Sequence, residues 1–168
     1  MDLLDFDAKE LYFDEACPAK VSELLAQAAK LYSEGEAEFP LLQAYLLAPE
    51  DLNVLVGLYR FFYYQHRYSE SLLIADRALT VTGKRLNLPS TAWEDLTPEI
   101  IAKVSDLPLL RFYLLALKGA AYLNLRLDKL AQGRAMLEKL IRLDSEDRLG
   151  ASALLQVVNE VEALPILN

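Results

Sequence analysis

A chain of 168 residues, of which 54% are hydrophobic and 25% charged, is long enough for one domain with its own core and too apolar to be disordered. Its formal net charge of −8 argues against nucleic acid as a partner, and the lack of an uncharged apolar run of about 18 residues argues against a membrane span. The acidic start of the chain is unlike the basic leader of a signal peptide, so we expect a cytoplasmic protein with one domain over residues 1–168.

The negative charge is concentrated in the first third of the chain. Residues 1–50 contain eleven Asp and Glu against three Lys, whereas residues 51–168 contain fourteen acidic and fourteen basic side chains. This distribution favours a basic or cationic-patched protein as the partner. Residues 1–17 interleave acidic with apolar side chains; such a segment either caps the first helical hairpin, which we favour, or binds a basic groove of a partner.

Helix signals dominate the first half of the chain. One helix opens at Pro18 and ends at Gly35, with apolar residues at helical spacing between them. A short second helix lies in the stretch 39–51 and is ended by Pro49. A third runs from about 51 to 65, and Ser69 is expected to cap a fourth over residues 69–86.

Residues 86–108 interrupt this pattern with three prolines and the only tryptophan, Trp93. The stretch is too long for a turn between helices, so we interpret it as an insertion that either packs over the fourth helix or serves as a specificity loop. Thr97 and Pro98 can start a short helix inside it. After Asp106 we expect a long helix over 109–125, another over 129–142, and a C-terminal capping helix over 147–164.

The third and fourth predicted helices resemble a tetratricopeptide repeat, and a later pair resembles it again. The apolar first-helix positions and small second-helix positions that carry the resemblance are Leu55, Leu58, Tyr59, Phe62, Ser71, Ala75 and Ala78, then Leu115, Lys118, Gly119 and Tyr122. The resemblance covers most of residues 18–147 in three degenerate units. It implies an all-α fold of helical hairpins, stacked as a short tetratricopeptide-like array with an insertion before the last repeat.

In such repeats the first helix of each hairpin lines a binding groove. The resemblance therefore implies that the groove is lined by Ser22, Leu25, Ala29, Tyr32, Asn53, Val56, Arg60, Tyr63, Tyr64, Tyr113, Ala116, Ala120, Leu123 and Asn124. Tyrosine, leucine and arginine suit a helix or an extended peptide of a protein client. The alternative is that terminal elements or the insertion fill the groove.

Nothing in the chain suggests catalysis, a metal site or a cofactor. The single cysteine, Cys17, and the single histidine, His66, leave no Cys/His or Ser/His/Asp arrangement, and no set of soft metal ligands. His66 lies in the turn after the third helix, where the repeat usually has glycine. We therefore expect a binding protein and not an enzyme.

A closer resemblance lies in the segments "LYRFFYYQHRYSESLLIADRAL" and "LLRFYLLALKGAAYLNLRLDKL", which are similar to short tetratricopeptide-like proteins encoded with bacterial nitrogen-fixation genes, of the nitrogenase-associated factor H type. The resemblance implies an assembly factor that holds immature molybdenum–iron protein as its client. We expect the chain to be a monomer or a weak homo-dimer. Two alternatives stay open: a three-repeat chaperone of the type III secretion kind, and a structural homo-oligomer.

Overall fold

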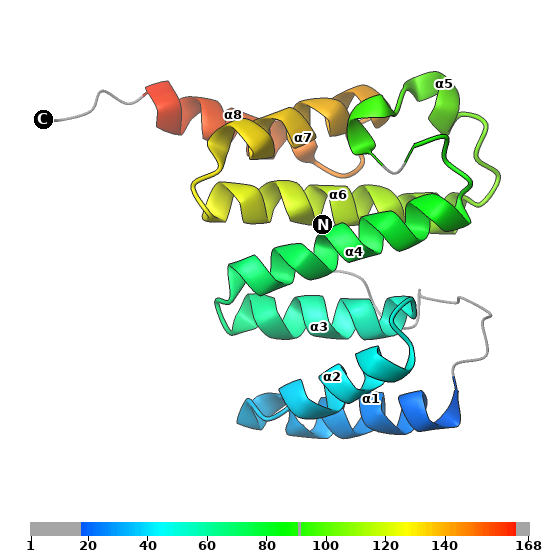
Figure 1. The fold of residues 1–168 in the computed structure, drawn as a ribbon. Helices are drawn as coiled ribbons and strands as arrows, with labels where there is room; N and C mark the ends of the chain where they lie inside the picture. The colour runs from blue at the N-terminus through cyan, green and yellow to red at the C-terminus, as the bar shows by residue number, and fades with distance from the viewer. Residues whose placement is uncertain (1–17, 91, 164–168) are drawn as a thin grey trace, which may run out of the picture.

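The computed structural model describes residues 18–90 and 92–163, and in these residues the chain is helical, without a strand (Figure 1). The all-α prediction is confirmed. The elements are α1 (Ala19–Leu31), the 3-10 helix η1 (Tyr32–Glu34), α2 (Glu38–Leu47), α3 (Leu52–Tyr64), α4 (Tyr68–Arg85), the 3-10 helix η2 (Trp93–Asp95), α5 (Pro98–Ile101), α6 (Leu107–Arg126), α7 (Leu130–Leu143) and α8 (Ala151–Ala163).

The helices stack in chain order as three hairpins, α1/α2, α3/α4 and α6/α7, followed by α8 (Figure 1). Each long helix packs on the one before it and the one after it, while α5 and η2 lie against α7. Stacking of this kind is required because one amphipathic hairpin cannot bury its apolar face alone. The predicted stack of hairpins with an insertion before the last one is therefore what the chain forms.

The same turn closes the first helix of each hairpin. In each case an amide donates to the carbonyl five residues back, as Glu36 does to Leu31, Arg67 to Phe62 and Lys129 to Asn124. The residue before that amide has a left-handed backbone, with φ of 76° at Gly35, 57° at His66 and 59° at Asp128. This is the Schellman ending of a helix, which satisfies its last carbonyls and reverses the chain.

Short polar side chains begin three of the helices. Asp51 accepts hydrogen bonds from the amides of Asn53 and Val54 and so starts α3, while Thr97 and Asp106 each accept one at the starts of α5 and α6. The carboxylate or hydroxyl satisfies amides that have no partner inside the helix. The prediction that Ser69 caps the fourth helix is wrong, because α4 already begins at Tyr68.

The insertion is folded onto the main core. Leu96 is buried beside residues of α4, α6 and α7, and the Lys139 ammonium of α7 donates to the carbonyls of Glu94 (2.6 Å) and Leu96 (2.8 Å). Trp93, at the start of η2, is half-buried and packs against the same core. The structure therefore favours the packing role of the insertion over a projecting loop.

The C-terminal helix starts later than the sequence predicted. The C-terminal helix begins at Ala151 and not at 147, because Asp147 and Gly150 both have a positive φ that no helix continues through. The predicted cap formed by residues 1–17 lies outside the described residues. Of the helices in the described part of the chain, none is both long and apolar enough to span a bilayer.

Candidate functional site

Aromatic rings gather where α3 ends, and Tyr63 lies at their centre. Its ring stacks on that of the buried Tyr59 (6.3 Å between centroids) and contacts those of Tyr64 (5.5 Å), Tyr68 (5.9 Å) and Tyr122 (6.1 Å). Tyr68 opens α4 and Tyr122 lies in the last turns of α6, so the cluster joins three helices. Tyr63 is half-buried, and Tyr64 is 58% exposed.

Arg126, the last residue of α6, closes the cluster on its outer side. Its guanidinium lies 4.5 Å from the centre of the Tyr68 ring, and donates to the hydroxyls of Tyr68 (2.7 Å) and Tyr122 (3.0 Å). The contacts combine a cation–π interaction with two hydrogen bonds. The hydrogen bond to the Tyr122 hydroxyl is the main cause of the raised pKa of Arg126, and the electrostatic interaction with the same residue raises it further. Arg126 therefore stays charged. The cation is thus held in place at the surface by two rings.

On its other side the cluster continues to α1 through Tyr32. The Tyr32 ring meets that of Phe61 edge-on at 6.1 Å, and its hydroxyl has no hydrogen-bond partner among the described residues. Burial is the main cause of the raised pKa of Tyr32; the phenol of Tyr64 raises it further and the cation of Arg60 lowers it. Tyr64 and Arg60 therefore lie close to Tyr32.

We call Arg60, Tyr63, Tyr64, Tyr68, Tyr122 and Arg126 the tyrosine–arginine patch. It contains three of the predicted groove residues, Arg60, Tyr63 and Tyr64, and Tyr32 adjoins it. Asn53 is half-buried two turns earlier on the same side of α3. Of the predicted groove residues, the structure thus brings Arg60, Tyr63 and Tyr64 together, with Tyr32 beside them.

Of the other predicted groove residues, Val56 and those on α6 are in the core, whereas on α1 Ser22 and Ala29 are exposed and Leu25 is half-buried. Val56 is only 5% exposed, and Tyr113, Leu123 and Asn124 are 0%, 0% and 4% exposed. The side-chain amide of Asn124 points into the molecule and donates a hydrogen bond to the carbonyl of Ala120 at 2.9 Å. These four side chains are therefore packing residues, which corrects their assignment to the groove.

The error on α6 is a shift of the repeat by two residues. Tyr59 and Gly119, which hold the same position in the two units that resemble the repeat, are 60 residues apart, whereas His66 and Asp128, which hold the same position in the matching turns, are 62 residues apart. Two residues turn a helix by about 200°, so the shift exchanges its buried and exposed faces. With the correct offset, Arg60 and Tyr64 correspond to Tyr122 and Arg126, the two patch residues that sequence reasoning missed. The left-handed turns were the signal that could have found them.

An apolar pocket of about 220 Å³ adjoins the patch on the α8 side. Tyr122 and Arg126 form one wall, and the rest of the lining consists of Leu125, Leu130, Leu154, Val157, Val158 and Val161. Leu130, Val157 and Val161 are exposed. The patch and this pocket together form a surface of rings, aliphatic side chains and one fixed cation, a composition suited to a protein ligand.

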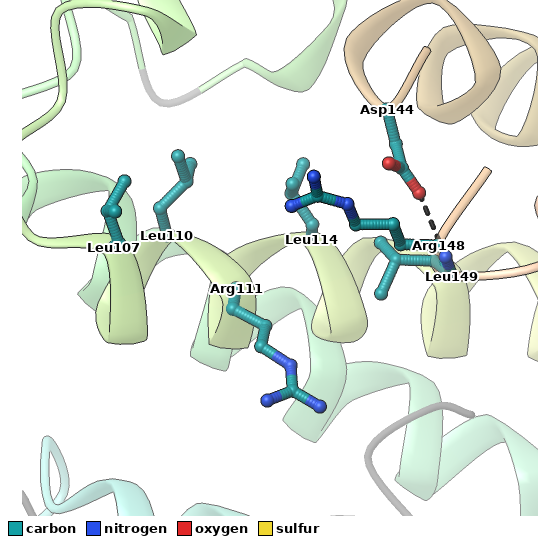
Figure 2. A pocket seen from close by; sticks show the side chains of 7 residues that line it. All are labelled: Leu107, Leu110, Arg111, Leu114, Asp144, Arg148 and Leu149. Carbon is teal, nitrogen blue, oxygen red and sulfur yellow. Dashed lines mark hydrogen bonds between the residues drawn. The ribbon is translucent and has the colours of Figure 1, made fainter. Parts of the chain in front are cut away.

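A second hollow lies at the other end of α6 (Figure 2). Leu107, Leu110 and Leu114 point from α6 toward the loop between α7 and α8, where Asp144 accepts a hydrogen bond from the amide of Leu149 at 2.8 Å. Arg111 points from the opposite side of α6, away from these leucines. The hollow of about 420 Å³ is mainly leucine-lined and holds no set of catalytic groups.

His66 was considered above as a catalytic or metal-binding residue, and its surroundings in the structure bear on both roles. The His66 imidazole is exposed, and its Nδ1 lies 2.9 Å from the Tyr68 hydroxyl, at the rim of the patch. Within residues 18–90 and 92–163 no three His, Cys, Asp or Glu side chains are grouped so that they could hold a metal ion. His66 is a turn residue with a left-handed backbone.

Comparison with known proteins shows a similar protein. The chain is 53% identical over 165 residues to the "uncharacterized 19.8 kDa protein in nifW 5′ region" of Azotobacter chroococcum mcd 1, and the match covers 97% of this chain and 92% of that protein. No protein-family model matches the chain. No solved structure matches it either.

Proposed function

The chain belongs to the family of the Azotobacter chroococcum protein from the nifW 5′ region, and from this premise we propose that it is a non-catalytic, tetratricopeptide-like assembly factor of nitrogen fixation. In this proposal it binds immature molybdenum–iron protein of nitrogenase in the cytoplasm and holds it during maturation. The name of the relative supports the link to nitrogen fixation, and the tyrosine–arginine patch supports a role in binding.

The single observation that carries the proposal is that four tyrosines and two arginines from three helices form one surface next to an apolar pocket. Tyrosine and arginine are the residues that contribute most at protein interfaces, because they bury a large area with few rotatable bonds and still form hydrogen bonds. Tyr63 and Arg126 are already held by their neighbours, so little side-chain entropy is lost when a client covers them.

The test is co-purification from nitrogen-fixing cells with the full chain tagged. Tyr64→Ala combined with Arg126→Ala should weaken client binding by about 2–4 kcal/mol, the range of two interface hot spots, while helix content is unchanged. Tyr64 is 58% exposed and Arg126 is at the surface, so neither replacement opens a cavity. Tyr63 is a poorer choice, because it contacts four rings.

A matched control removes exposed apolar side chains elsewhere. Phe39 and Leu46 on α2 are 70% and 80% exposed, and Phe39→Ala with Leu46→Ala should leave client binding intact. Equal loss in both double variants would contradict the patch as the binding surface. If no immature nitrogenase component co-purifies with the unaltered chain, the identity of the client is wrong.

A structural homo-oligomer is a second candidate, and α2 favours it. Phe39, Leu42, Leu46 and Leu47 are exposed on a stretch that has no charged side chain between Glu38 and Glu50. An uncharged apolar strip of this kind is unusual for a purely monomeric surface. Light scattering over a range of concentrations distinguishes a structural homo-oligomer from an assembly factor, because the assembly-factor proposal requires no more than a weak homo-dimer.

A further inference from the structure

The apolar pocket beside the patch has a cation at its rim. Its walls come from the last turns of α6, the start of α7 and one face of α8, and Arg126 is the only charged residue in its lining. Figure 1 shows that α6 and α8 end on the same side of the molecule, so the pocket opens where the two helices end. A cavity of about 150 Å³ with apolar walls can hold a benzene ring, so the pocket of about 220 Å³ has room for one large apolar side chain.

The guanidinium of Arg126 still has donors for a ligand. It carries five N–H groups, of which one is donated to the hydroxyl of Tyr122 and one to that of Tyr68. Within residues 18–90 and 92–163 no carboxylate forms an ion pair with it. Because the planar guanidinium matches a carboxylate with two parallel hydrogen bonds, a carboxylate is the ligand that suits the remaining donors. The two rings already hold the cation in position, which lowers the entropy that is lost when a ligand binds.

The apolar surface continues from the pocket along α8. Val157 and Val161 are 53% and 57% exposed and lie four residues apart, so they share one face of the helix. Together with Leu154 they cover about 10 Å along the helix axis, which is two turns. A partner helix presents its apolar residues over the same length when they recur at i, i+3 or i+4, and i+7. The surface therefore fits an amphipathic helix better than a single small molecule.

The polar side chains nearest along α8 are bonded within the fold and are not part of the pocket. Glu160 accepts a hydrogen bond from Gln156 at 2.8 Å, and Asn159 accepts one from Arg134 of α7 at 2.5 Å. None of these four residues lines the pocket. A ligand at this place thus meets aliphatic side chains and one positive charge, although the net charge of the protein is −8. Complementarity here requires an acidic residue in the ligand.

We propose that this pocket and Arg126 anchor an amphipathic helix of the protein client, in which a large apolar residue is followed or preceded by an acidic residue one turn away. The apolar side chain fills the pocket, its neighbours on the same face lie on Val157 and Val161, and the carboxylate accepts hydrogen bonds from Arg126. The inference rests on the proposed role in binding a client, and it names the chemistry of the segment that is bound.

Two synthetic peptides of about 15 residues test the site, both blocked at their ends so that no terminal carboxylate competes. One has leucines at helical spacing with a glutamate on the same face, and in the other a glutamine replaces the glutamate. They are titrated into the full chain with labelled leucine and valine methyl groups. The methyl resonances of Leu154, Val157 and Val161 should shift, and the acidic peptide should bind at least about threefold more tightly. Shifts only elsewhere, or no binding, would overturn the proposal.

The charge is tested by exchanging one partner at a time. Arg126→Gln keeps a side chain that can donate to the tyrosine hydroxyls but removes the charge. It should weaken binding of the acidic peptide at least about threefold and abolish the difference between the two peptides. If the acidic peptide keeps its advantage in this variant, Arg126 is not the group that binds the carboxylate, and the proposal is wrong.

The apolar part of the site is tested by Val157→Ser combined with Val161→Ser. Both residues are exposed and serine has a similar helix propensity, so the fold should be retained, while both peptides should bind at least about threefold more weakly. Leu46→Ser with Leu47→Ser is the matched control, because these residues of α2 are 80% and 57% exposed and lie outside the lining of the pocket. Equal weakening in both double variants would contradict binding at α8.

Two further results separate the other possibilities. Methyl resonances of the pocket that shift when the protein alone is diluted would place a second copy there and overturn the proposal. Unimpaired co-purification of the client with the Val157→Ser, Val161→Ser variant would also overturn it, and would leave the assembly function standing. If the peptides bind as expected but no nitrogenase component co-purifies with the unaltered chain, the site is supported and the identity of the client is wrong.

Discussion

Tyr113 shows at the scale of one residue how a polar group can be buried at a cost. Its ring is fully buried on α6 near Gly83, and its hydroxyl has no hydrogen-bond partner among the described residues. Burial raises the pKa of this phenol far above its usual value of about 10, and the carboxylate of Glu94 raises it further. An unpaired buried hydroxyl costs about 1–3 kcal/mol, so the ring contributes through its apolar area alone.

Tyr113→Phe should therefore leave the free energy of unfolding at pH 7 unchanged or raise it by up to about 1 kcal/mol. The pKa of Tyr113 is higher in the folded than in the unfolded state, so its contribution is complete below pH 10 and is lost as the pH rises above that value. The phenylalanine variant lacks this loss. Urea unfolding at pH 7 and at about pH 10.5 should show its advantage growing with pH. A variant that is less stable at both values would reveal a hydrogen bond to the hydroxyl.

At the scale of helices, the start of a helix could be predicted from its cap, whereas the alignment of one hairpin with another could not be predicted from the sequence. Asp51, Thr97 and Asp106 could be recognised as helix starts because a cap depends only on a few neighbouring residues. The start of α8 was missed because Asp147 and Gly150 break a pattern that looks helical. The faces of α6 depended on aligning two hairpins that are separated by the insertion, and an error of two residues there moved Tyr113 from the core to the groove.

The α6–α7 pair depends on one close approach. A Cβ atom placed on Gly133 of α7 would lie 2.6 Å from Cδ2 and 2.7 Å from Cγ of Leu125, and 3.0 Å from the carbonyl oxygen of Ala121. Neither the Leu125 branch point nor the α6 backbone can move easily, so this glycine lets the two helices pack closely.

Gly133→Ala should destabilise the protein by about 1–3 kcal/mol through overpacking, despite the higher helix propensity of alanine. Gly83→Ala in α4 is the matched control, because its added Cβ would meet Tyr113 and Leu88 at ordinary distances of 3.6 and 3.8 Å. That change should stabilise the protein by up to about 1 kcal/mol. Chemical denaturation of both variants gives the comparison, and equal signs would contradict the packing argument.

For the whole molecule, the core consists of two clusters and not one. The smaller contains buried residues of α1, α2 and α3, and the larger extends from α3 through α4, α6 and α7 to α8 and the insertion. Tyr45 and Ile74 pack against both clusters. In a stack whose elements contact only their neighbours, the end with the smaller cluster can open while the rest stays folded.

Native-state hydrogen exchange should therefore show α1 and α2 opening with a free energy at least about 2 kcal/mol below that of α6. Leu117→Ala, at a fully buried site in the larger cluster, should lower the protection of α6 by about 2–4 kcal/mol and that of α1 and α2 by less, because these helices lose protection only when complete unfolding becomes easier than their own opening. Leu58→Ala, equally buried in the smaller cluster, should lower the protection of both regions, because complete unfolding includes opening of that cluster. If Leu117→Ala weakened α1 and α6 equally, the two clusters would unfold as one cooperative unit.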